Sequence, residues 1–438
     1  MTDVAERTDR AHFIADLEAL ATSEAPDWLK ELRADAAAEF NATEFPTYRD
    51  EVWRRTDIKA ILRTEFQSTA GASPTLGQDD IAQFSYAQDG MLELVLVDGV
   101  YSPDLSSTSD APDSITVSSL AEALTNNVQG LRAQLNDTAK NTSAFVPLNT
   151  AFIQDGAYID VPDNTQFETP IHVLYITTRS GSVATHPRNL IVVGQSSQVT
   201  LIESYVSLGD TNDYLTNGVT EIALGDNAKV THYKLIDEGA HAYHMFSTQV
   251  HEGRDCSFNS HVMTLSGQIV RNELNVDLAG ENGNCDLNGL YLNDGDRLID
   301  NALFVQHSVS RCYSRMGYKG VLDDKSTSVF TGKVVVPPDS QQTDSDQLNN
   351  NLLLSDNATI NTNPQLEIFA DDVKCTHGAT IGGFPPELVF YFQSRGMDAA
   401  TADGILTYGF AAEVVDSIKV ESLRTRLSDY VFKKYSPK

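Results

Sequence analysis

Cys375 and His377 stand two residues apart in a segment whose alternating pattern predicts a β-strand, which Gly378 then interrupts. Side chains at positions i and i+2 leave a strand on the same face, so the thiol and the imidazole are expected to point the same way. A thiolate beside an imidazole suits iron or zinc, yet it makes only half a site, because iron–sulfur clusters and structural zinc take about four protein ligands. The spacing alone leaves two interpretations open: a metal half-site, or two residues that are merely packed.

The other chemistry-bearing residues form no recognisable catalytic motif. Gly332-Lys333 is followed by Val334 rather than Ser or Thr, so there is no P-loop, and nucleotide hydrolysis would have to come from a partner. The Gly-x-Ser-x-Gly elbow of many serine hydrolases is missing as well. His241 and His244 lie among predicted strands, where positions three apart face opposite sides, and we expect no metal site there.

Four cysteines are spread widely along the chain, without a C-x-x-C pair or a zinc-finger spacing. This pattern favours reduced thiols in a reducing compartment over disulfides. We expect Cys256, Cys285 and Cys312 to be small buried residues, and His307 to make a hydrogen bond in the core.

Composition excludes several functional classes. The chain has 438 residues, a formal net charge of −30 and a sequence pI near 4.5, so it is expected to repel nucleic acid. No run of about 18 apolar residues predicts a membrane span, and the polar N-terminus lacks the apolar region of a signal peptide, so we expect a cytoplasmic protein. With 41 % hydrophobic residues the chain can bury a sizeable core.

Periodicity divides the chain into three textures. Residues 9–40 predict two helices, and residues 386–430 predict two or three more after Pro385-Pro386. Between about 150 and 380, short strands alternate with turns, and glycines at 194, 225, 253 and 280 recur at intervals of 31, 28 and 27 residues. Such spacing is typical of the coils of a β-solenoid, and Asn at the turns tolerates left-handed backbone. A β-helix is therefore predicted, with a β-sandwich as the alternative.

Many segments, in the right order, resemble the SufB/SufD family, whose members are scaffold subunits of the SUF system for iron–sulfur cluster assembly. The Cys375-x-His377 segment, residues 371–380 (DDVKCTHGAT), is similar to the SufD branch of that family. The other matching segments are 45–47 (FPT), 50–53 (DEVW), 148–152 (LNTAF), 318–325 (YKGVLDDK), 329–333 (VFTGK), 351–356 (NLLLSD), 364–368 (PQLEI), 390–396 (FYFQSRG) and 409–413 (GFAAE).

The resemblance implies an architecture. It implies a mainly β protein whose core is a right-handed parallel β-helix over residues 148–383. An N-terminal, mostly helical domain would span residues 1–147, and a C-terminal helical domain would span residues 384–438.

The resemblance also implies a function that is not enzymatic. The chain would pair with SufB, or with a second copy of itself, through the end of the β-helix near residues 350–380. His377, with Cys375 as the secondary candidate, would contribute ligands to a nascent iron–sulfur cluster at that interface. The C-terminal helices would dock the ATPase subunit SufC, and participation of a flavin is left open.

Two other functions are compatible with a β-helix. Carbohydrate-active lyases and hydrolases also use this fold, but they need clustered carboxylates and are usually secreted, whereas the acids here are scattered over the predicted strands. A self-sufficient metal-binding protein would need more Cys and His clusters than this sequence offers.

Overall fold

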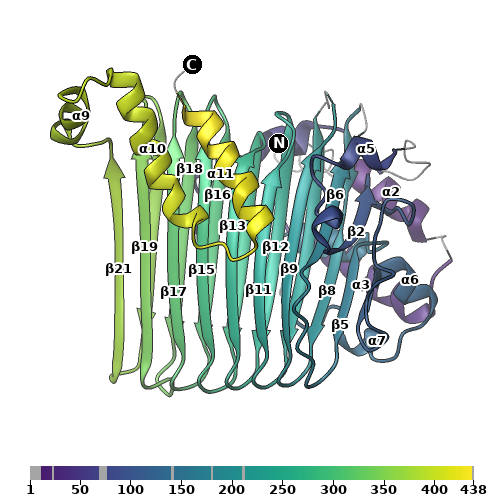
Figure 1. Ribbon diagram of the computed structural model, residues 1–438. Helices are drawn as coiled ribbons and strands as arrows, with labels where there is room; N and C mark the ends of the chain where they lie inside the picture. Colours follow the sequence, from purple (N-terminus) through teal and green to yellow (C-terminus); the bar gives the residue numbers. More distant parts are fainter. Residues whose placement is uncertain are drawn as a thin grey trace.

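The computed structural model describes residues 11–21, 24–68, 76–139, 143–178, 181–209 and 213–436, and its central feature is a parallel β-helix (Figure 1). One long sheet contains β4 (Thr116–Ser119), β5 (Ala157–Val161), β8 (Arg188–Val193), β10 (Tyr214–Leu224), β12 (Ala242–Glu252), β14 (Ile269–Leu278), β16 (Leu298–His307), β18 (Thr327–Val336) and β20 (Thr359–Ile368), with β1 (Gln67–Ser68) and β7 (Val183–Thr185) attached at its side.

The second long sheet faces the first. It contains β3 (Val100–Tyr101), β2 (Leu92–Val97), β6 (Ile171–Thr177), β9 (Gln198–Ser207), β11 (Lys229–Asp237), β13 (Ser257–Ser266), β15 (Asn284–Asn293), β17 (Tyr313–Leu322), β19 (Thr343–Leu353) and β21 (Val373–Gly382).

Each strand of the main body pairs in parallel with the strand two positions further along the chain, so that two successive strands make one coil. The register offset between paired residues is 27 between β13 and β15, 31 between β9 and β11, and 32 between β18 and β20. The predicted parallel β-helix and the length of its coil are confirmed, and the β-sandwich alternative is wrong.

The recurrent glycines are explained by contact between neighbouring coils. A Cβ atom added at Gly280 would lie 2.2 Å from the backbone nitrogen of Arg254 in the previous coil, so no side chain fits there. Two residues after Gly225 and Gly280 come Asn227 and Asn282, each with a φ near +60°. Asparagine tolerates this left-handed backbone better than most residues, as predicted for these turns.

Apolar side chains form a core inside the β-helix, in which polar residues such as Glu203 and Lys234 are also buried. The core includes Val199, Val230, Phe258 and Cys285, which occupy paired positions on successive strands of the second sheet. This continuous core explains why the coils form one body, since a single coil cannot bury its own apolar face.

Helices cover the outer faces. The N-terminal part contains α2 (Ala11–Ala21), α3 (Asp27–Ala42), the 3-10 turns η1 (Glu51–Trp53) and η2 (Ala87–Asp89), α4 (Lys59–Arg63), α5 (Gln78–Ile81), α6 (Leu120–Thr125), α7 (Leu131–Gln134) and α8 (Phe145–Ala151). The C-terminal part contains α9 (Pro386–Gln393), α10 (Ala399–Val415) and α11 (Glu421–Tyr435). The helices predicted over residues 9–40 are α2 and α3, although residues 9 and 10 lie outside the described part.

The C-terminal helices lie across the second sheet, and α9 projects beyond its last strand (Figure 1). Val414 and Leu427 pack against outward-facing residues of that sheet, including Leu235 and Met263. Of the described helices, none is long and apolar enough to cross a membrane.

A buried ion cluster joins the N-terminal part to the β-helix. The Arg271 guanidinium on β14 stacks on the ring of Trp53 at 3.7 Å from its centroid and donates a hydrogen bond from Nη1 to the carbonyl of Val52 at 3.1 Å. It also pairs with Glu273 at 2.9 Å and with Asp300. Trp53 itself is 3 % exposed, so it acts as a packed anchor whose cationic partner comes from the β-helix.

Candidate metal site at the open end of the β-helix

The last coil of the β-helix is made of β20 and β21, the outermost strands of the two sheets. The alternating pattern of the sequence runs through this region without a break, but the structure places a turn at 369–372 between β20 and β21. Leu366 and Ile368 therefore face the same interior as Cys375, from the opposite sheet. Cys375 and His377 share one strand and one face, as predicted.

Strand pairing fixes the direction of these two side chains. Cys375 stands beside Ser345 of β19, and His377 stands beside Gln347. Ser345 and Gln347 are almost fully buried inside the β-helix, at 2 % and 1 % exposure. In the described part of the chain β21 is the last strand of its sheet, so its inward-facing side chains are left partly open. His377 is exposed and Cys375 is half-buried.

The imidazole of His377 is oriented by a backbone group of the facing strand. Its Nδ1 lies 3.0 Å from the carbonyl oxygen of Pro364 on β20. A carbonyl can only accept, so Nδ1 must carry the proton of this hydrogen bond. In the neutral ring the acceptor is then Nε2, and a backbone carbonyl that fixes the tautomer in this way is a common arrangement for metal-binding histidines.

Gln347, which lies beside His377 in the preceding coil, makes an equivalent contact. Its Nε2 donates to the carbonyl of Gln365 at 3.1 Å, so two neighbouring side chains bind two successive carbonyls of β20. The Gln347 Oε1 atom is buried without a hydrogen-bond partner. Pro364 interrupts the hydrogen-bonding pattern in the middle of β20, which is tolerated because β20 is an edge strand.

The thiol of Cys375 is a weaker candidate metal ligand than the imidazole of His377. It packs against the hydrophobic core, and burial raises the pKa of this thiol above its usual value. The nucleophilic and metal-binding form of cysteine is the thiolate, so a metal must displace a proton here. His377 is therefore the stronger candidate of the two.

The open end holds only part of a metal site. Within the described residues, no three His, Cys, Asp or Glu side chains come together in a way that could hold an ion. An iron ion bound to His377 would need ligands from another molecule, since iron–sulfur clusters take about four.

Large apolar side chains surround this end. Ile381 is 52 % exposed on the inward face of β21, Phe369 is 63 % exposed in the adjoining turn, and Leu348 is 43 % exposed on β19. Unpaired strand edges with exposed apolar residues are typical of surfaces that pair with another chain.

A second apolar surface lies on α9, none of whose residues is buried. Leu388, Phe390 and Tyr391 are 39 %, 67 % and 50 % exposed. Such a helix needs a partner for its aromatic side chains, because monomeric proteins rarely leave a group of them uncovered.

The other histidines and cysteines take the places expected of them. His307 Nε2 bonds the Ser314 hydroxyl at 2.9 Å inside the β-helix. Cys256, Cys285 and Cys312 are buried and free. His241 is exposed, whereas His244 is buried beside Glu238, so these two histidines do not converge.

Three buried polar residues form a cluster that the sequence does not reveal. Glu93, His172 and Ser204 form a hydrogen-bonded chain on the outer face of the second sheet, far from the open end. The residues come from three strands and are separated by 79 and 32 positions, so no short motif marks them. Their proximity becomes visible only once the register of β2, β6 and β9 is known.

Comparison with protein families covers nearly the whole chain. Residues 175–410 match the model of the SUF system FeS cluster assembly SufBD core domain, and residues 7–173 match the model of the SufBD protein N-terminal region. Together these matches contain the β-helix and the helices that precede it.

Individual relatives agree with these matches. An iron–sulfur cluster assembly SufBD family protein of Synechocystis is 32 % identical over 91 % of this chain and 89 % of the relative. The iron–sulfur cluster assembly protein SufD of Escherichia coli is 30 % identical over 88 % of both chains. Protein ABCI7 of Arabidopsis thaliana chloroplasts is 28 % identical over 92 % of this chain and 85 % of the relative.

Proposed function

This chain belongs to the SufBD family of the SUF system for iron–sulfur cluster assembly, and we propose that it acts there as a scaffold subunit of the SufD type. The observation that carries the proposal is the incomplete ligand set at the open end of the β-helix. His377 offers an oriented imidazole on a sheet edge that no strand among the described residues covers.

In this proposal the nascent cluster is cargo, assembled between two subunits. The Nε2 atom of His377 supplies one iron ligand, and a thiolate of the partner supplies at least one more. Cys375 joins as a second ligand from this chain once a metal has displaced its proton. Soft sulfur and imidazole nitrogen together suit iron.

The partner in this proposal is SufB, which pairs with the edges of β20 and β21. Pairing would cover Phe369 and Ile381 and would satisfy the free backbone groups of both edge strands. A second copy of this chain is the alternative partner, since two copies would bring two His377 side chains together.

The ATPase partner SufC is proposed to dock on α9 and the adjacent part of α10. The exposed residues Leu388, Phe390 and Tyr391 provide aromatic anchors of the kind that dominate binding energy at interfaces. Binding of ATP by two such subunits would draw them together and twist the scaffold, which would open the interface between the two β-helices.

Co-expression of this chain with the SufB and SufC proteins of the same organism tests the proposal. We expect an affinity tag on this chain to retain both partners, and anaerobic preparations to contain iron and acid-labile sulfide above the level of the chain purified alone. Failure to retain either partner, in cells that contain both in folded form, would refute the scaffold role.

A further inference from the structure

Three exposed arginines lie in the segment that anchors the N-terminal part to the β-helix. Arg49, Arg54 and Arg55 are exposed, and none of them forms an ion pair with another residue of the described part of the chain. The chain has 31 basic and 61 acidic residues, so a carboxylate is the expected partner of most of its cations. Arginines without such a partner are free to bind another molecule.

The fold holds two of these arginines in an outward direction. Trp53 and Thr56, which flank Arg54 and Arg55, are only 3 % and 4 % exposed. Trp53 stacks against Arg271 of β14, and the Thr56 hydroxyl donates to a buried carboxylate on β16. Because both flanking side chains are fixed against the β-helix, the two arginines are presented on a backbone that needs little ordering when a partner binds.

The same segment reaches the edge strand of the first sheet. The Nε2 atom of Gln365 on β20 donates to Oε1 of Glu51 at 3.4 Å. Gln365 faces outward, because the next residue along the strand, Leu366, packs in the interior. The carbonyl of Pro364, one residue earlier, is the group that orients His377. The segment therefore lies outside the edge strand that borders the candidate metal site.

Two exposed apolar side chains accompany the arginines. Tyr48 is 66 % exposed and Val52 is 47 % exposed. The Arg49 guanidinium lies 5.9 Å from the centroid of the Tyr48 ring. Tyrosine and arginine are residue types that are enriched at protein interfaces and contribute strongly to binding. This mixture of exposed apolar and basic side chains over residues 48–55 is typical of a surface that binds protein.

We propose that residues 48–55 bind an acidic surface of the partner that pairs with the edge of β20, and thereby orient the two proteins before their strands pair. The inference rests on the proposed function, because it requires that a partner occupies this edge. A strand added to β20 would continue the first sheet beside the segment, so the protein that supplies it would come within reach of Tyr48 and the arginines.

Charge complementarity sets the chemistry of the partner surface. Guanidinium groups bind carboxylates through charge-assisted hydrogen bonds, often two at a time. The carboxylates of the segment itself, Asp50 and Glu51, already accept hydrogen bonds from neighbouring residues. The chain as a whole has a net charge of −30 and repels an acidic protein, so exposed arginines guide such a partner to this place. Charges at the edge of an interface act mainly on the rate of association.

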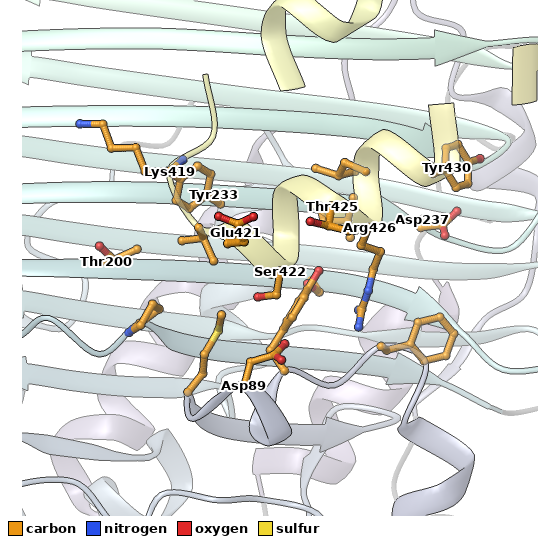
Figure 2. A pocket seen from close by; sticks show the side chains of 18 of the residues that line it. Asp89, Thr200, Tyr233, Asp237, Lys419, Glu421, Ser422, Thr425, Arg426 and Tyr430 are labelled. Carbon is orange, nitrogen blue, oxygen red and sulfur yellow. The ribbon is translucent and has the colours of Figure 1, made fainter. Parts of the chain in front are cut away.

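The cavity beside α11 shows no such preference for one sign of charge. It has a volume of about 1210 Å³ and lies between α11, the outer face of the second sheet and the segment around residues 83–91 (Figure 2). Figure 2 shows Arg426 of α11 reaching toward that segment, and Asp89 and Glu421 border the same cavity. Arg426 is already engaged, since its Nη2 donates to the carbonyl of Ser85 at 3.0 Å.

Reversal of charge in the full-length chain tests the proposal. The test variant replaces all three arginines of residues 48–55 by glutamate. The control variant makes the same change at three exposed cations that have no ion pair within the described residues and lie on α3, α7 and β11, namely Lys30, Arg132 and Lys229. Surface plasmon resonance then measures association of each variant with the purified SufB protein of the same organism over a series of salt concentrations.

We expect the association rate constant at low salt to fall at least about tenfold in the test variant and less than about threefold in the control. The wild-type rate constant should fall as salt rises, and that of the test variant should not. Equal rate constants for the wild type and the test variant at every salt concentration would overturn the inference and leave the scaffold role intact. A wild-type chain that does not bind SufB would refute both.

Lysine at the three arginine positions separates charge from fold. We expect this variant to keep the association rate constant within about threefold of the wild type, because steering depends on charge. A loss as large as that caused by glutamate would overturn the inference. A fluorescent DNA duplex is a second probe: binding by the wild type that the glutamate variant loses would assign residues 48–55 to nucleic acid instead.

Discussion

Substitution of Ile381 by aspartate should weaken pairing of this chain with its β-helix partner by about a hundredfold. Ile381 is half-exposed on the last strand, at the surface that the proposed interface covers. Loss of its apolar contact, together with burial of an unpaired charge, should cost about 3 kcal/mol, which corresponds to roughly a hundredfold in affinity. Titration of the partner by isothermal calorimetry or surface plasmon resonance measures this change.

Val100→Asp is the matched control for that experiment. Val100 is 46 % exposed on β3, which ends the second sheet on the side opposite to β21. The same change of residue type at this position should leave partner affinity unaltered. Equal affinities of the Ile381 variant and the Val100 variant would mean that the partner binds elsewhere.

Substitution of Arg271 by alanine should lower the free energy of unfolding by about 3–5 kcal/mol. The variant leaves Asp300 fully buried without its cationic partner, and removal of one member of a buried pair has this cost. Burial raises the pKa of Asp300 and Arg271 acts against that shift, so the carboxyl would have to take up a proton in the variant. The stacking contact with Trp53 is lost at the same time.

Urea denaturation of the isolated chain, followed by far-UV circular dichroism, measures this loss. Arg254→Ala is the control, because Arg254 pairs with Asp226 and Asp255 on the surface with 62 % of its side chain exposed. Exposed ion pairs of this kind contribute less than about 1 kcal/mol to the free energy of unfolding. Asp300→Asn in the Arg271→Ala background should restore part of the stability. If both arginine variants lost the same small amount, the buried cluster would not anchor the N-terminal part.

The coils of the β-helix could be predicted because each one needs a residue without a Cβ atom at the same place. Gly194, Gly225, Gly253 and Gly280 recur where neighbouring coils approach too closely for a side chain, and this spacing is visible in the sequence. The face shared by Cys375 and His377 could be predicted for a similar reason, since both lie on one strand with a period of two.

Contacts between distant strands could not be predicted in this way. The turn at 369–372 was hidden because its residues continue the alternating pattern of β20. The carbonyl of Pro364 that orients His377 belongs to the opposite sheet, and only the folded coil brings it within reach. Arg271 and Trp53 are 218 positions apart, so their stacking left no local signal.

The most direct test of the proposed scaffold role compares His377→Ala with His241→Ala in the anaerobically co-purified complex. Both variants remove an exposed imidazole, but only His377 lies at the open end of the β-helix. We predict that both variants retain their partners, and that iron and acid-labile sulfide per complex fall at least about tenfold in His377→Ala alone. Equal, wild-type amounts of iron and sulfide in the two variants would contradict a cluster ligand at His377.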